Sequence, residues 1–443
     1  MTTKHYRVPP KLVGYYLKKN GQPKTIREIG SLCGDVERRL LKKRRSRQKL
    51  FRMHIGNPSV DTPRPLINYQ CMAINSPGIT NSYAPCDGDP TLKKEASNFL
   101  SKFCDVYIPP KYCISSAGGA HGLYLVMKAW HDVLQVNNDT RDTMLLFAPY
   151  FPVHKMQADD VNFKTESIEF YDYRGEEKLR DELERLLSKG NIHSILYSNP
   201  NNPAWLSLTK EELAVIGELA DKYNVLVIED LAYFGMDFRY DYSRPGEAPY
   251  QPTVAKHCKN YAIVLSSSKF ISYPGERCGI VAISPSIGID SNAELSPAIY
   301  DHIAFKGMAL TISSVPHSSQ VGMAMFLRDL NNGKINFREA LMEYRDKAKK
   351  IKNLFIEKGF YLTYADDCGE PIADGFYFTI SRIGFSSEQL FLELTYYGIF
   401  VVPLNLCGSK RDGVRICISF VNPDDIPELE NSLKLFDLDH TNE

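Results

Sequence analysis

Four short apolar runs, each separated from the next by a helical pattern, constrain the fold of this 443-residue chain more than any other feature. They are rich in β-branched and aromatic residues and are apolar at successive positions, which is typical of strands covered on both faces by helices. The runs are "TMLLFAP" (143–149), "IHSILYSNP" (192–200), "VLVIEDLAY" (225–233) and "YAIVLSSSK" (261–269). Their alternation with helices predicts an α/β fold built on a doubly wound, mostly parallel sheet.

Helical signals fill the segments between and after these runs. "TLKKEASNFLSKFC" (91–104) places its apolar side chains on one stripe, and Thr209 and Glu212 form the pattern of a capping box before the third run. After about residue 330 a long charged helix (338–359) leads into strand-like segments at 375–380 and 413–419.

We therefore expect two domains. The large one spans 68–330, and a smaller α+β domain is formed by both chain ends, 1–67 and 331–443, because the first sixty or so residues have no sheet pattern of their own.

Composition excludes several classes of protein. Lys plus Arg and Asp plus Glu both number 53, so no overall charge attracts nucleic acid or an anionic membrane. No apolar run approaches the roughly 18 residues of a membrane span, and the N-terminus lacks the apolar stretch of a secretory signal. The ten cysteines lack the spacing of a zinc site. We expect a cytoplasmic protein with reduced thiols and no metal.

One local charge bias stands out in the segment 38–52, "RRLLKKRRSRQKLFR", where nine of fifteen residues are basic. A patch for nucleic acid or phosphate is one interpretation. The favoured one is a solvated helix face whose apolar residues, Leu40, Leu41, Leu50 and Phe51, dock on the rest of the protein, since the chain has no other nucleic-acid motif.

Polar side chains gather where the predicted strands end. Asn202 follows the second run, Asp230 and Tyr233 close the third, and the fourth leads into "SSSK", which contains Ser266, Ser268 and Lys269. Ligands of open parallel sheets bind at the carboxyl ends of the strands. The sequence therefore places an amide, a carboxylate and an amine at one candidate site.

This set of groups fits one kind of chemistry. A lysine that forms a Schiff base needs a lowered pKa, which burial or a neighbouring cation such as Arg277 supplies. Arg277, eight residues after Lys269, also suits phosphate, as does the helix opened by Gly118, Gly119 and Ala120. A buried Asp230 needs a cationic partner, and a protonated pyridine nitrogen is one. The aromatic Phe151 after the first run either stacks on such a ring or simply packs.

The motifs "SNPNNP" (198–203), "EDLAY" (229–233), "SSSKFISYPGERCG" (266–279) and "GVRICIS" (413–419) resemble those of the class I/II aminotransferases, pyridoxal-phosphate enzymes of the aspartate aminotransferase fold (fold type I). Their order matches, and so do the intervals: 28 residues from Asn202 to Asp230, 39 more to Lys269 and 8 more to Arg277. The resemblance extends from about residue 56 to the end of the chain.

The resemblance implies a role for each matching residue. Lys269 resembles the Schiff-base lysine that also moves the substrate proton, and Asp230 the partner of the pyridinium nitrogen. Asn202 and Tyr233 resemble the donors to the phenolic oxygen of pyridoxal 5'-phosphate, and Phe151 its stacking aromatic. The phosphate cup would be formed by Gly119, Ala120, Ser266, Ser268 and Arg277.

Three further residues resemble groups that bind substrate or a second subunit. Arg415 resembles the clamp for the substrate α-carboxylate, with Gly56 as a backbone contact and Asn202 nearby. Tyr83 resembles the tyrosine that reaches the phosphate of a partner subunit, which implies a homodimer with shared active sites.

The chain departs from the family pattern at three places. Ala204 and Trp205 replace the usual Thr-Gly after "NNP", and Ala120 stands where Ser or Thr is common. Dicarboxylate-specific members have an arginine upstream of a motif like "ISSVP" (312–316), where this chain has Lys306 and an apolar stretch. We therefore expect the amino donor not to be a dicarboxylate.

The sequence thus predicts an aminotransferase that moves an amino group from an amino acid to a 2-oxo acid by a ping-pong Schiff-base mechanism. A pyridoxal-phosphate-dependent C–S β-lyase or γ-eliminating synthase would use the same residues to hold the cofactor. A non-catalytic regulator that binds nucleic acid through 38–52 is the distant alternative.

Overall fold

The computed structural model describes residues 5–42, 49–288 and 294–440, and the chain divides into two compact units. Unit 1 comprises Met1–Ser59, Asn202–Leu206 and Met342–Glu443, and unit 2 comprises Val60–Asn201 and Ser207–Leu341. The helix α13 (Arg338–Glu357) crosses the last boundary between them.

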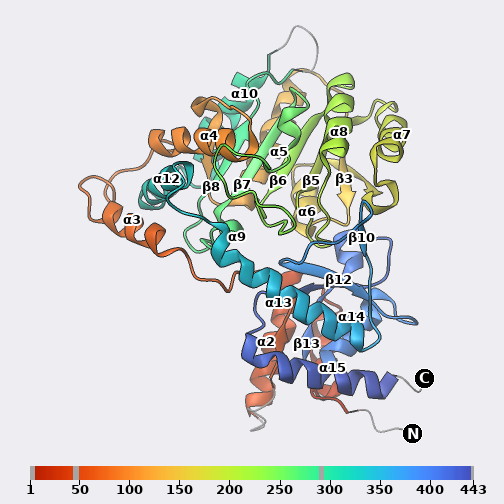
Figure 1. Ribbon diagram of the computed structural model, residues 1–443. Coiled ribbons are helices and arrows are strands. Elements are labelled where there is room, and N and C mark those ends of the chain that lie inside the picture. The colour runs from red at the N-terminus through yellow and green to blue at the C-terminus, as the bar shows by residue number, and fades with distance from the viewer. Residues whose placement is uncertain (1–4, 43–48, 289–293, 441–443) are drawn as a thin grey trace. The chain divides into compact units, whose positions relative to one another are not determined.

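Unit 2 is built on a seven-stranded sheet whose strand order is β2-β8-β7-β6-β5-β3-β4 (Figure 1). The strands are β2 (Cys113–Ser116), β3 (Thr143–Ala148), β4 (Lys164–Glu169), β5 (Ile192–Ser198), β6 (Leu226–Leu231), β7 (Tyr261–Ser266) and β8 (Gly279–Ile283). β8 runs antiparallel to both of its neighbours, β2 and β7, and the other pairs of strands in this sheet are parallel. The prediction of an α/β fold with a mostly parallel sheet is confirmed.

Helices surround this sheet, and α5 packs on β2, β6, β7 and β8. The helices of unit 2 are α3 (Arg64–Ile74), α4 (Pro90–Cys104), α5 (Gly119–Val136), α6 (Pro152–Asp160), α7 (Glu176–Leu187), α8 (Lys210–Lys222), α9 (Ser267–Phe270), α10 (Ser296–Asp301), α11 (Met308–Thr311) and α12 (His317–Asn331). A π-helical turn, His302–Gly307, joins α10 to α11.

The predicted capping box begins α8, as the sequence indicated. Thr209 Oγ1 accepts a hydrogen bond from the Glu212 backbone N–H at 3.1 Å, and Glu212 Oε2 accepts one from the Thr209 N–H at 2.9 Å. These bonds satisfy two N–H groups that the first turn of a helix leaves without partners.

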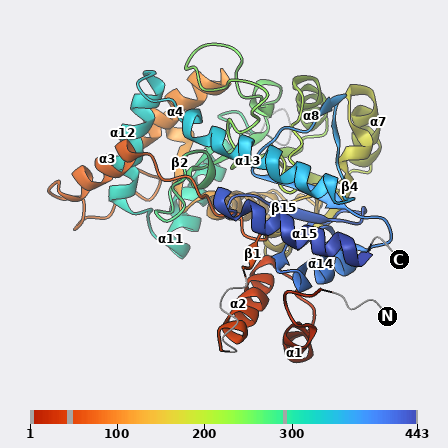
Figure 2. The ribbon, with the colours of Figure 1, turned by 60° about the horizontal axis from the view of Figure 1, so that its bottom comes forward.

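Unit 1 contains a four-stranded antiparallel sheet in the order β14-β15-β12-β9 and a parallel pair, β1 with β13. Its strands are β1 (Phe51–Arg52), β9 (Tyr361–Leu362), β10 (Asp366–Asp367), β11 (Glu370–Pro371), β12 (Tyr377–Ser381), β13 (Ile399–Phe400), β14 (Val402–Pro403) and β15 (Val414–Cys417). Its helices are α1 (Pro10–Asn20), α2 (Ile26–Lys42), α14 (Ser387–Tyr396) and α15 (Ile426–His440). Figure 2 shows α1 and α2 side by side.

The basic segment 38–52 is only partly as predicted. Leu40 and Phe51 are buried and Leu50 is half-buried, but the expectation that Leu41 docks is wrong, because its side chain is 57% exposed. Positions 43–48 lie outside the described residues. The described arginines of the segment are paired: Arg38 and Arg39 contact Asp35, and Arg52 contacts Glu37.

The described part of the chain has neither a candidate membrane span nor a candidate metal site. No helix in it is both long and apolar enough to cross a membrane. No three His, Cys, Asp or Glu side chains in it converge as the ligands of a metal ion would.

Candidate active site

Three neighbouring parallel strands of unit 2 bring their carboxyl ends to one edge of the sheet. Ser198 at the end of β5 lies in register with Asp230 in β6, and Asp230 with Val264 in β7. The run 261–269 was predicted to be one strand, but β7 ends at Ser266. There the Ser266 hydroxyl accepts a hydrogen bond from the Ser268 N–H at 3.3 Å, which begins the single helical turn α9 that carries Lys269.

Asp230 is buried and both of its carboxylate oxygens have partners. Its Oδ2 lies 3.1 Å from His154 Nε2, and its Oδ1 accepts a hydrogen bond from the Ala232 N–H at 3.0 Å. His154 is itself fully buried on α6. No local pattern in the sequence indicates this contact, because the two residues are 76 positions apart.

Phe151 and Tyr233, which are predicted to contact the cofactor, adjoin the elements that carry His154 and Asp230. Phe151 is the N-cap residue of α6, and its ring meets the His154 imidazole edge-on, with centroids 5.6 Å apart. Tyr233 is buried and lies two residues after the end of β6. The structure therefore brings Phe151, His154 and Asp230 together within unit 2.

A cradle of small residues and one arginine forms at the start of α5. The Gly119 N–H donates to Ser266 Oγ at 3.4 Å, and Arg277 Nη2 donates to the Ala117 carbonyl at 3.0 Å. Gly118 has a φ of 79°, and a Cβ added there would lie 2.5 Å from Arg277 Nη2. Glycine is thus required where the guanidinium approaches the backbone.

This cradle combines the charges that an anion needs. The N-terminal N–H groups of the 18-residue α5 and the Arg277 guanidinium lie together there. Ser268 is half-buried and lies two residues after Ser266, the N-cap residue of α9. Ala120 is exposed, and its carbonyl accepts a hydrogen bond from Gln157.

His121 supports the cradle without adding charge. Its Nδ1 accepts a hydrogen bond from the Ala117 N–H at 3.0 Å, and its Nε2 lies 3.0 Å from Thr311 Oγ1. Burial, together with the charge of Arg277, lowers the pKa of His121, which favours the neutral ring.

Arg415, Asn202 and Gly56 come together in unit 1. Arg415 is buried on β15, where its Nη1 donates to Asn202 Oδ1 at 3.0 Å and its Nη2 to the His54 carbonyl at 2.7 Å. A Cβ added to Gly56 would lie 2.0 Å from the hydroxyl oxygen of Tyr377, and the Arg415 guanidinium lies over the ring of that tyrosine. Burial and the charge of Arg415 lower the pKa of His54 to about 3, so this histidine is neutral.

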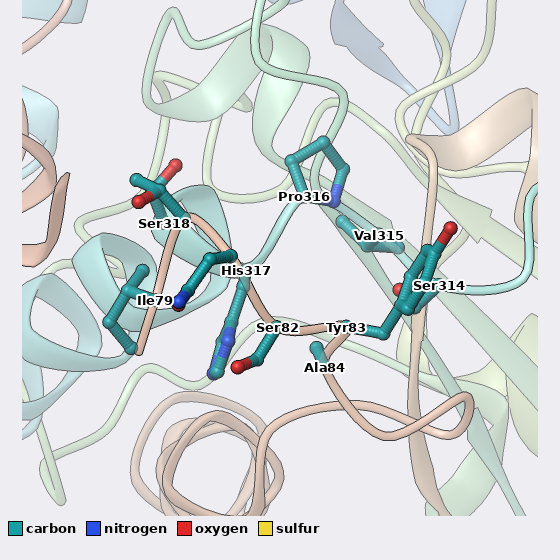
Figure 3. A pocket seen from close by; sticks show the side chains of 11 residues that line it. Ile79, Ser82, Tyr83, Ala84, Ser314, Val315, Pro316, His317 and Ser318 are labelled. Carbon is teal, nitrogen blue, oxygen red and sulfur yellow. The ribbon is translucent and has the colours of Figure 1, made fainter. Parts of the chain in front are cut away.

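Tyr83 stands apart from these groups, with 88% of its surface exposed. It lines a pocket of about 600 Å³ in unit 2, between the segments 79–84 and 314–318 (Figure 3). Ser82 and His317 contribute polar side chains to the same pocket. Lys306, the cation upstream of this turn, is paired with Asp132 at 2.5 Å.

Comparison with known proteins places the chain in one family. The family model described as "Aminotransferase class I and II" matches residues 49–433. An aspartate aminotransferase of Pyrococcus horikoshii is 27% identical over 396 residues, covering 86% of this chain and 92% of that protein. Glutamate-pyruvate aminotransferase AlaC of Escherichia coli is 28% identical over 201 residues, covering 45% and 46%.

Solved structures agree at the level of the fold. Aspartate aminotransferase from Thermus thermophilus with maleate has a TM-score of 0.72 at 16% identity, covering 96% of this chain and 98% of that one. An aminotransferase from Eubacterium rectale has a TM-score of 0.73 with the same identity and coverage. At such identities the likeness concerns the fold.

Proposed function

This chain belongs to the class I and II aminotransferases, pyridoxal-phosphate-dependent enzymes that transfer an amino group from an amino acid to a 2-oxo acid, and from that premise we propose that its own cofactor lysine is Lys269. The observation that carries the proposal is the edge of the unit 2 sheet, where β6 and β7 end in Asp230 and in the turn bearing Lys269.

The residues at this edge fit pyridoxal 5'-phosphate. The cradle of Gly118, Gly119, Ser266 and Arg277 has the backbone N–H groups and the positive charge that a phosphate requires. The buried Asp230, oriented by His154, fits a protonated ring nitrogen. When bound, the cofactor supplies a carbonyl that condenses with amines and a ring that accepts electrons from the substrate Cα.

Side chains of this protein would then hold the cofactor and the substrate and move the substrate proton. Lys269 would hold the cofactor through its Nζ, and the same amine, once the substrate is bound, would take the proton from the substrate Cα and later give it back. Asp230 would keep the ring nitrogen protonated, and Tyr233 and Asn202 would serve as hydrogen-bond donors to the phenolic oxygen. Arg415 binds the substrate α-carboxylate through its guanidinium.

We further propose a homodimer in which Tyr83 acts on the partner subunit, which its exposure supports. Complementation between two inactive variants tests this arrangement. Tyr83→Ala and Lys269→Ala should each have low activity, and refolding the two proteins together should restore part of it. If mixing restores nothing, Tyr83 acts within its own subunit.

A spectral screen tests the function itself. Purified protein loaded with cofactor is mixed with each of the twenty amino acids, and conversion of the bound cofactor to its pyridoxamine form is followed by absorbance. Conversion by a subset, reversed by a 2-oxo acid, is the expected result. Release of pyruvate and ammonia from a β-substituted amino acid without a 2-oxo acid would identify a lyase instead.

A further inference from the structure

Trp205 occupies a place in unit 1 that the sequence marks as unusual. Its φ of 63° lies in the left-handed region that favours glycine, and its side chain is completely buried. A Cβ added to Gly375 would lie 2.1 Å from the indole Nε1 and Cε2 atoms. The indole therefore fills a space that exists only because position 375 has no side chain.

The indole packs against Tyr377, and Tyr377 packs against Arg415. The rings of Trp205 and Tyr377 meet at 67° with centroids 5.9 Å apart. On the same tyrosine ring, the Arg415 Cζ lies 4.5 Å from the centroid. Glycine at position 56 leaves room for the Tyr377 hydroxyl. The tyrosine ring is thus held between an indole, a glycine and a guanidinium.

The register of the sheet explains why these side chains meet. Thr379 of β12 lies directly opposite Arg415 of β15, and Tyr377 lies opposite Cys417. Side chains two residues apart share a face of a strand, so Tyr377 is the diagonal neighbour of Arg415.

The guanidinium is held by hydrogen bonds and by the tyrosine ring. Nη1 donates to Asn202 Oδ1, and Nη2 donates to the His54 carbonyl. Rotation about the Cδ–Nε bond would tilt these bonds, and the ring that packs against the guanidinium also opposes that rotation. A cation over an aromatic face is also attracted electrostatically, most strongly when both groups are buried.

We propose that Tyr377 is a positioning residue that sets the plane in which Arg415 receives a substrate carboxylate, and that Trp205 holds the Tyr377 ring in place. This inference rests on the proposed role of Arg415. Bidentate binding of a carboxylate requires a coplanar guanidinium, so a loss of the ring should weaken ligands that have a carboxylate more than those that lack one.

The experiment compares an amino acid that responds in the screen with the amine that lacks only its carboxylate, such as alanine with ethylamine or phenylalanine with phenethylamine. Dissociation constants are measured by titrating the absorbance of the cofactor-loaded enzyme. Tyr377→Leu should weaken amino-acid binding about tenfold and amine binding less than threefold, with kcat changed less than KM. Tyr377→Phe keeps the ring and should preserve both constants.

Two further variants make the result decisive. Trp205→Leu should weaken the amino acid about threefold without affecting the amine, because the tyrosine ring loses its support. Tyr361→Leu, on the exposed strand β9 of the same sheet, is the matched control and should change neither ligand.

Equal weakening of amino acid and amine in Tyr377→Leu would overturn the proposal, since it would show a purely structural role. If that variant fails to fold, Trp205→Leu decides by the same comparison. Arg415→Lys separates the two proposals. If Arg415→Lys leaves the preference for the amino acid over the amine unchanged, the proposal that Arg415 binds the substrate carboxylate is wrong. If it abolishes the preference and Tyr377→Leu does not, only the inference about Tyr377 fails.

Discussion

Replacing His154 by leucine tests whether the orientation of Asp230 matters for catalysis. The imidazole provides one of the two hydrogen bonds that hold the buried carboxylate, at 3.1 Å, and the Ala232 N–H provides the other. Leucine fills a similar volume without a polar atom. The carboxylate would then turn about its remaining hydrogen bond and lose its alignment with the cationic ring nitrogen.

The size of the effect follows from the kind of bond that is lost. A hydrogen bond to a charged group contributes about 1.5–3 kcal/mol. Because about 1.4 kcal/mol corresponds to a factor of ten, His154→Leu should lower kcat about 10- to 150-fold. The dissociation constant of the cofactor should rise over a similar range.

The assay measures kcat with the best donor from the screen and the cofactor dissociation constant by equilibrium dialysis. His154→Gln is the control, since its amide can still donate from near the Nε2 position, and it should recover much of both values. Thermal unfolding checks that each variant is folded. A folded His154→Leu enzyme whose kcat and cofactor affinity stay within twofold of the original would refute the reasoning.

Three other predictions concern the cradle, a buried acid and a helix end. Gly118→Ala should weaken cofactor binding at least about tenfold, because the added Cβ would displace Arg277. The control is Gly78→Ala, at a similar φ of 85° but with open space around it, which should leave the cofactor affinity unchanged. Equal effects of the two substitutions would contradict the role of the cradle in binding phosphate. Burial raises the pKa of Glu229 from its ordinary 4.5 to about 7, so the native state holds the proton more tightly and the free energy of unfolding should fall as the pH rises from about 4.5 to about 7. Urea unfolding at pH 5 and pH 8 should show that the free energy of unfolding falls less between these two pH values in Glu229→Gln than in the original protein. An equal fall in both proteins would show that other groups cause it. Thr209→Ala should lower the free energy of unfolding by about 1 kcal/mol and Thr209→Asn by much less, and urea unfolding that finds no difference between the two would show that the cap contributes little.

Local patterns in the sequence were enough to predict four of the seven strands of the unit 2 sheet, β3, β5, β6 and β7, and the polar groups where they end. The runs at 143–149 and 192–200 are apolar at successive positions, and both form buried strands. Parallel strands end at a common edge, so Asp230 and Ser266 could be assigned to the same edge before the structure was known. The end of β7 was less predictable, because the Ser266 side chain that starts α9 can also occur within a strand.

The sequence has no local pattern that indicates contacts between distant segments. His154 meets Asp230, and Trp205 meets Tyr377, from positions that are far apart in the chain. Neither pair has a spacing that a helix or a strand would explain. Leu41 is the opposite case, in which a pattern indicated a contact that the structure does not have. Its apolar side chain suggested burial, but of the two neighbouring leucines Leu40 is buried and Leu41 is exposed. Which side of a helix is covered depends on its packing partners as well as on its own residues.

The most direct test of the central claim identifies the lysine that holds the cofactor. The loaded enzyme is reduced with borohydride, which fixes the cofactor to the amine that carries it, and is then digested and analysed by mass spectrometry. The account predicts the modification on Lys269 and its absence in Lys269→Ala. Modification of another lysine in the original protein, or full turnover by Lys269→Ala, would contradict it.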